Sequence, residues 1–208
     1  MLALKKEIRE FLTEAYSETH RFYHTLEHIN SVLATIDEFN DQVYDHDAIM
    51  LAAWFHDVIY NVDDRYQFNE HRSSLDLVYY LDKYHPEYLM TSAGFKSVFT
   101  ACMMILCTKS HSLETVKYTD ITLSQISDIS FFLDADLRIL SEDREKLLRF
   151  EENIRKEFSE YDDLVYNSNR KNVLESFLAR EKIYYSEVGS NWEKPARKNL
   201  KFLIERLS

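Results

Sequence analysis

The stretch Leu51–Tyr60 reads Leu-Ala-Ala-Trp-Phe-His-Asp-Val-Ile-Tyr and places His56 and Asp57 side by side in an apolar run. Burying two adjacent polar side chains among apolar residues costs several kcal/mol unless each has a partner. A divalent metal ion suits both, because imidazole nitrogens and carboxylate oxygens are common metal ligands. The simpler explanation is a core histidine neutralised by a nearby carboxylate. The metal interpretation therefore requires further ligands elsewhere in the chain.

Other polar residues stand in helix-like apolar segments, and they could supply those ligands. His24 and His28 are one helical turn apart, so they share a helix face. The remaining candidates are His111 and the pair Asp134 and Asp136. One shared site explains several such residues better than separate energetic defects do. Mixed imidazole and carboxylate ligation suits Mn, Fe, Co, Ni or Zn, or Mg with more water in its shell.

The elements that must position these residues are expected to be helices. The chain has 208 residues, of which 45% are apolar and 14% aromatic, but only two Gly and two Pro. So few chain breakers leave little room for the tight turns of a β-rich fold. The length suits one domain with a substantial core. We therefore predict an all-α helical bundle that forms a single domain over residues 1–208.

The periodicity of apolar residues predicts where these helices lie. The dyad is expected inside a helix bounded by the polar stretches 45–47 and 61–64, with the two side chains roughly 100° apart around its axis. Thr25 or a residue just before it is expected to begin the helix that carries His28, and the helix opened by Asn69 should end before Pro86. Other helices are predicted over residues 4–17, 95–108 and 121–140. Three more are predicted between Ser141 and Ser208, with edges at residues 161–163, 167–169 and 189–191.

The net charge, the lengths of the uncharged stretches and the cysteine spacing argue against some classes of function. A formal charge of −11 argues against a broad nucleic-acid surface, because phosphate binding needs clustered Lys and Arg. No uncharged stretch reaches the ~18 residues of a membrane span. The N-terminus becomes charged too early for a signal peptide, and Cys102 and Cys107 fit no metal or redox motif. We therefore expect a cytoplasmic protein with free thiols. The sequence is compatible with either a monomer or a homodimer.

Three motifs together resemble the HD superfamily of metal-dependent phosphohydrolases. They are Tyr-His-x-x-x-His-Ile at 23–29, Trp-Phe-His-Asp at 54–57 and Leu-Asp-Ala-Asp-Leu at 133–137. A bacterial family of HD phosphohydrolases carries the same three in this order, and the similarity continues into the C-terminal helices. The resemblance implies a helical bundle of the HD-domain type that holds a divalent metal.

The resemblance also implies roles for single residues. His56 and Asp57 match the dyad and would both bind metal. Residues 23–28 are similar to the Tyr-His-Asn-x-x-His stretch of cyclic-nucleotide phosphodiesterases, which makes His28 a ligand and His24 the general acid, with the reverse assignment open. Asp136 is the preferred distal ligand. Asp134 would orient it or replace it.

Five further residues are weaker candidates. Glu70 and His111 could support a second metal or position water in catalysis, or they could simply be a helix cap and a loop histidine. Arg21, Arg72 and Arg170 could clamp a phosphate of the substrate, because guanidinium is planar and bidentate. Each arginine could equally occupy a solvated surface position.

The expected function is hydrolysis of a phosphoester or phosphoanhydride in a small molecule such as a nucleotide. A divalent cation supplies ionised water near neutral pH, and a histidine protonates the leaving oxygen. Residues 24–28 also fit H-x-x-E-H, an inverted zinc-protease motif with Glu27 as base, but this leaves the dyad unexplained. Two more functions stay open, namely a non-catalytic nucleotide or metal sensor and a di-iron oxygenase that would need Glu70 and His111.

Overall fold

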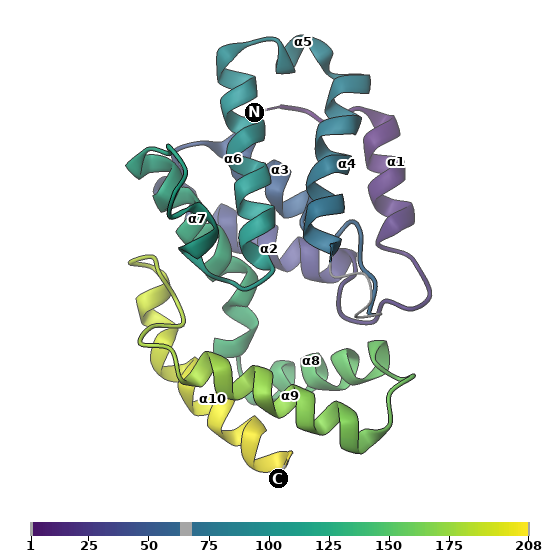
Figure 1. Ribbon diagram of the computed structural model, residues 1–208, viewed down its shortest axis with the longest axis vertical. Coiled ribbons are helices and arrows are strands. Elements are labelled where there is room, and N and C mark those ends of the chain that lie inside the picture. Colours follow the sequence, from purple (N-terminus) through teal and green to yellow (C-terminus); the bar gives the residue numbers. More distant parts are fainter. Residues whose placement is uncertain (1, 63–67, 208) are drawn as a thin grey trace. The chain divides into compact units, whose positions relative to one another are not determined.

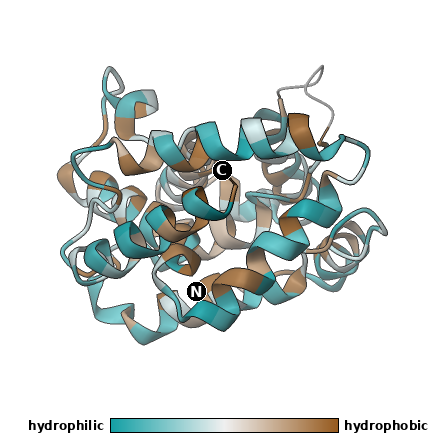
Figure 2. Ribbon diagram, turned by 90° about the horizontal axis from the view of Figure 1, so that it is seen from below, coloured by the Kyte–Doolittle hydropathy of each residue, from teal (hydrophilic) through white to brown (hydrophobic). Residues whose placement is uncertain are grey.

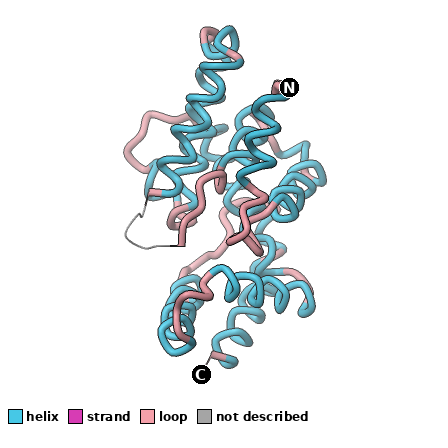
Figure 3. Tube along the Cα trace, turned by 90° about the vertical axis from the view of Figure 1, so that its right-hand side faces the viewer, coloured by secondary structure: helices cyan, strands magenta, loops and turns pink. Residues whose placement is uncertain are grey.

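The structure is a computed structural model that describes residues 2–62 and 68–207. Throughout these residues the chain forms helices, turns and loops without a strand (Figures 1 and 3), which confirms the predicted all-α fold. The chain divides into two compact units, residues up to 133 and residues from 134. The boundary falls near the end of helix α7, Leu123–Asp136. A single HD-type domain over residues 1–208 stays a prediction.

The first unit contains most of the described helices. Thr25 begins α2 as predicted, because its side chain accepts a hydrogen bond from the Glu27 amide at 3.3 Å. The fourth helix stops at Tyr84, before Pro86, which also agrees with the sequence. The α-helices are α1 (Lys6–Ala15), α2 (Leu26–Glu38), α3 (His46–Phe55), α4 (Asn69–Tyr84), α5 (Pro86–Leu89), α6 (Ser92–Thr108) and α7 up to residue 133.

Helix α3 lies in the core of this unit and leads directly to the dyad. It packs along α6 and also contacts α2 and α4. Six of its ten residues are buried, and three of these are alanines, which let neighbouring helices approach closely. Most of the other helices show both hydrophilic and hydrophobic segments (Figure 2). This pattern is typical of helices that cover a core with one face only.

Two carboxylates fix the start of α3. Asp45 is the N-cap residue and accepts hydrogen bonds from the Ala48 amide at 3.0 Å and from the Ser97 hydroxyl of α6 at 2.8 Å. Asp128 of α7 accepts hydrogen bonds from the amides of Tyr44 and Asp45 at 2.9 and 2.8 Å. Burial raises the pKa of the Asp128 carboxyl. The first turn of α3 is thus held by α6 and α7 as well as by its own cap.

Three predicted boundaries were wrong. Helix α3 ends at Phe55, so the dyad follows the helix and does not lie inside it. The segment predicted as one helix over 121–140 changes at Asp136 into a 3-10 helix, Leu137–Ser141. The edge predicted at 167–169 lies inside a helix, because Asn and Ser disfavour helix only weakly and packing overrides them.

Residues 134–207 of the second unit form three longer helices, as predicted, two short 3-10 segments and the last residues of α7. Asn199 donates hydrogen bonds to the carbonyls of Leu140 and Glu142 at 2.9 and 2.8 Å, which satisfies acceptors left over where the 3-10 helix ends. The elements are the 3-10 helix Leu137–Ser141, α8 (Arg144–Glu157), α9 (Asp163–Leu178), the 3-10 helix Gly189–Asn191 and α10 (Glu193–Arg206).

The hydropathy of the helices bears on membrane insertion. In the part of the chain that the structure describes, every helix is too short or too polar to cross a bilayer.

Candidate metal centre

The dyad lies in a tight turn that terminates α3. His56 is the C-cap residue, and its side chain is 1% exposed. Its Nδ1 lies 3.1 Å from the Ala53 carbonyl oxygen. Because a carbonyl can only accept a hydrogen bond, Nδ1 must carry the proton there. The Nε2 atom of the neutral ring then presents a lone pair instead of a proton, as a metal ligand requires.

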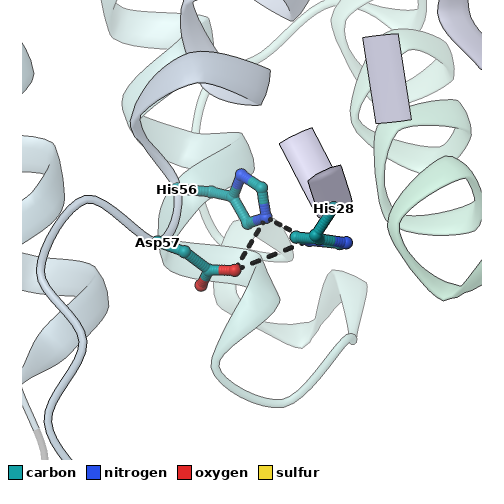
Figure 4. A group of neighbouring side chains, drawn as sticks. All are labelled: His28, His56 and Asp57. Carbon is teal, nitrogen blue, oxygen red and sulfur yellow. Dashed lines mark hydrogen bonds and ion pairs between the residues drawn. The ribbon is translucent and has the colours of Figure 1, made fainter. Parts of the chain in front are cut away.

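His28 brings a second imidazole to the same place from the first turn of α2. Its Nε2 lies 3.1 Å from Nε2 of His56 and 3.6 Å from Oδ2 of Asp57. The third side of this triangle, from His56 Nε2 to Asp57 Oδ2, is 3.0 Å (Figure 4). The three side chains point toward one another although the dyad lies 28 and 29 positions after His28 in the sequence. Residues far apart in the chain thus present three ligand atoms to one point.

The spacing of these three atoms fits a bound cation. For a metal–ligand distance of about 2.1 Å, two ligands lie about 3.4 Å apart in a tetrahedral site and about 3.0 Å apart in an octahedral one. The observed separations of 3.0, 3.1 and 3.6 Å match these values. Two imidazoles and one carboxylate are also a common donor set for first-row divalent metals. His28, His56 and Asp57 could therefore hold such an ion.

The electrostatics keep the carboxylate ionised. Burial acts to raise the pKa of Asp57, but the nearby imidazoles of His56, His24 and His28 together hold it well below its ordinary value. An ionised carboxylate is the form that binds a metal. This lowering comes from positive charge on the imidazoles, so it acts while they are protonated. A metal ion would replace that charge once the histidines release their protons to bind it.

His24 lies beside the cluster and is not part of it. Its ring centroid is 6.0 Å from that of His28, and its ring stacks on Tyr60 at 4.1 Å with an interplanar angle of 28°. The group of ligand atoms within 4.8 Å of one another contains His28, His56 and Asp57 but not His24. The geometry thus groups His28, and not His24, with the dyad, and the role of His24 as proton donor stays a prediction.

Asp134 and Asp136 belong to the second unit. The Asp134 side chain is fully buried, and it accepts hydrogen bonds from the amides of Tyr185 and Ser186 at 2.8 and 2.7 Å and from the Ser186 hydroxyl at 2.6 Å. A Cβ atom at Gly189 would lie 2.3 Å from this carboxylate, so only glycine fits there. Burial raises the pKa of Asp134 to about 6. The contacts favour a structural anchor, and Asp136 stays a predicted ligand.

The weaker catalytic candidates lie outside the three-residue group. Glu70 stands in the first turn of α4, and His111 follows α6 with a φ of 44°. That left-handed backbone conformation is uncommon except for glycine, and it suits a chain reversal after α6. Among the described residues neither side chain belongs to the group that could hold an ion. Their catalytic roles stay predictions.

The three arginines predicted to contact substrate have different surroundings. Arg72 is exposed on α4. Arg170 on α9 forms a two-pronged ion pair with Glu151. The Arg21 side chain is 0% exposed and donates to the main-chain carbonyls of His24, Asp57 and Val58. A direct substrate contact by Arg21 would require these hydrogen bonds to break, and its bracing position could not be foreseen from sequence.

A scan against protein-family models and a search of the curated proteins both gave no match. The candidate metal centre therefore rests on the geometry of this chain alone.

Proposed function

We propose that the protein is a metal-dependent phosphohydrolase of the HD type. The observation that carries this proposal is the triangle of His28, His56 and Asp57, whose ligand atoms lie 3.0 to 3.6 Å apart. When bound there, a divalent cation would supply ionised water at neutral pH and neutralise charge on phosphoryl oxygens. The proposed substrate is a phosphoester or phosphoanhydride of a small molecule such as a nucleotide.

The residues of the chain would divide the remaining work. Asp57, His28 and His56 would hold the cation in a fixed place. His24, one turn from His28 and outside the ligand group, would donate its proton to the leaving oxygen. Its ring is held by the stack on Tyr60, which limits the directions in which it can point. Asp136 stays a predicted further ligand.

The contacts give the rival functions less support. An inverted zinc protease needs both histidines of H-x-x-E-H on the metal, yet His24 is outside the ligand group and Glu27 is exposed. A di-iron oxygenase needs further ligands, and neither Glu70 nor His111 belongs to the group. A non-catalytic sensor would bind metal without turnover, so activity must be measured directly.

The decisive experiment is a hydrolysis panel of nucleoside mono- and triphosphates, cyclic nucleotides and p-nitrophenyl phosphate with Mn²⁺, Mg²⁺, Co²⁺ or Ni²⁺. His56→Ala and Asp57→Ala should lose both metal uptake, measured by calorimetry, and hydrolysis. The matched control is His46→Ala, which removes a histidine from the other end of α3. Unchanged hydrolysis by the Asp57 variant would mean that a contaminant is responsible. A protease would instead lose activity in Glu27→Gln.

A further inference from the structure

Arg21 has a fully buried guanidinium near the candidate metal centre, and it forms four hydrogen bonds. Its side chain is 0% exposed, and Nε donates to Oε2 of Glu18 at 2.9 Å. The Nη1 atom donates to the carbonyls of Asp57 at 2.7 Å and His24 at 3.3 Å, and Nη2 donates to the carbonyl of Val58 at 2.9 Å. The guanidinium thus joins main-chain atoms of two segments that are more than 30 residues apart in sequence.

The surroundings hold this guanidinium in one place. Its central carbon lies 5.3 Å from the ring centroid of Tyr16 and 5.5 Å from that of Tyr60. The Tyr60 ring also stacks on His24, and the Tyr60 carbonyl lies 3.0 Å from Nε2 of His20. Two aromatic contacts and four hydrogen bonds leave a planar cation little freedom.

The bonds of Arg21 also hold the turn that follows α3. A helix that continued past Phe55 would direct the carbonyls of Asp57 and Val58 to amides further along the chain. Both carbonyls instead accept hydrogen bonds from Arg21. The turn at residues 56–58 therefore depends on a side chain from the loop before α2. That turn sets the direction in which the Asp57 carboxylate leaves the main chain.

We propose that Arg21 is a positioning residue, which fixes the main chain at Asp57 and His24 so that the ligand carboxylate and the proton donor keep their places around the metal centre. This role rests on the proposed function, and it replaces the phosphate contact predicted for Arg21. Lysine cannot substitute, because one ammonium nitrogen cannot span carbonyls that a guanidinium reaches with separate N–H groups. Loss of such an outer contact typically weakens metal binding about 10- to 100-fold.

The chain provides a matched control in Arg197 of the second unit. Its Nε donates to Glu193 at 2.7 Å, and its Nη atoms donate to the carbonyls of Leu178, Arg180 and Glu181 at 2.7 to 2.9 Å. Arg197 therefore makes the same kinds of bond as Arg21, and all these partners lie outside the metal cluster. Arg197→Lys measures the general cost of losing a bracing arginine.

The test is a calorimetric titration of the full chain with Mn²⁺ alone, below the unfolding temperature of every variant. We expect Arg21→Lys to weaken Mn²⁺ binding about 10- to 100-fold and Arg197→Lys to leave it within about threefold of wild type. The role of Arg21 is overturned if Arg21→Lys also binds within that range, or if both variants weaken binding equally. If circular dichroism shows that Arg21→Lys does not fold, the uncharged Arg21→Gln takes its place.

A second measurement separates this role from the proposed function. If the wild type takes up no Mn²⁺, the proposed function fails, and Arg21 is then judged on metal-free protein by amide hydrogen exchange. Faster exchange at residues 24–25 and 57–60 in Arg21→Lys than in Arg197→Lys would support the brace. Equal exchange in the two variants would overturn it.

Discussion

At the scale of single residues, His24 and His28 are two histidines one helical turn apart that have different surroundings. His28 faces the Nε2 atom of His56 at 3.1 Å, whereas His24 stacks on Tyr60 and stays outside the ligand group. A histidine that is not a ligand can carry a proton and release it near neutral pH. The two residues should therefore respond differently to substitution.

His24→Gln should keep Mn²⁺ affinity and lose hydrolysis. General acid catalysis raises the rate about 10²- to 10⁴-fold, and its contribution is largest when the leaving group is poor. We expect a loss in that range for an alkyl phosphate and a much smaller loss for p-nitrophenyl phosphate, whose leaving group needs no proton. Steady-state rates on the two esters measure the difference. An equal loss on both esters would exclude His24 as the acid, and His28→Gln serves as the comparison that loses metal.

Asp134 should make folding stability depend on pH. Its pKa is raised from 3.8 to about 6 by burial, so the folded state binds a proton more tightly than the unfolded chain. Its stabilising contribution is full below pH 3.8 and is lost as the pH rises to about 6. The unfolding free energy of wild type relative to Asp134→Asn should fall by about 2–3 kcal/mol between about pH 4 and pH 6.5. Urea titrations in chelator measure it, and a constant difference would contradict the raised pKa.

The candidate site could be predicted from sequence where residue type and local spacing decide the outcome. A polar pair in an apolar run, and a histidine one helical turn from another, indicate Asp57, His56 and His28 from sequence alone. The sequence predicts a substrate contact for Arg21, because residue type indicates the chemistry of a guanidinium but not its neighbours. Its partners are carbonyls of residues 57 and 58, which only the folded chain brings near.

At the scale of helices, α3 leads into two of the three residues of the cluster, and its first turn is held by its own cap, by α6 and by α7. Asp45 caps α3 and also binds Ser97 of α6, whereas Thr91 caps α6 through the Gly94 amide at 2.9 Å and is exposed. Asp45→Ala should cost about 2 kcal/mol and Thr91→Ala about 1 kcal/mol, at the upper end and the middle of the range for N-caps. Urea denaturation followed by circular dichroism measures both. Equal costs would mean that the bond to Ser97 contributes nothing.

The helices themselves could be predicted more reliably than their ends. Apolar periodicity indicated α1, α2, α4 and the three C-terminal helices, whereas α6 was indicated by the length and composition of a hydrophobic segment. The end of α3 was misplaced by several residues, since Val58 and Ile59 continue the apolar run. The decisive contacts are tertiary: Arg21 holds the carbonyls beyond Phe55, and the Ser73 hydroxyl accepts a hydrogen bond from the Ile59 amide at 3.1 Å.

At the scale of the whole molecule, the division into two compact units predicts where bound metal should stabilise the chain. His28, His56 and Asp57 all belong to the first unit. An ion at about 100 times its dissociation constant stabilises the folded state that binds it by about 2.7 kcal/mol. Amides of α2, α3 and α4 that exchange through unfolding of that unit should then exchange about 100-fold more slowly, while those of α8, α9 and α10 should not change.

Hydrogen exchange read by mass spectrometry measures this distribution with and without Mn²⁺. His56→Ala is the control, because it removes one ligand and should abolish the protection in α2 to α4. Equal protection of α8 to α10 would mean that the units unfold together or that Asp136 of the second unit also binds the ion, and the prediction would then be wrong. Protection confined to the second unit would place the ion away from His28, His56 and Asp57. That result would contradict the metal centre itself, because a ligand slows exchange only in the part of the chain whose unfolding releases it.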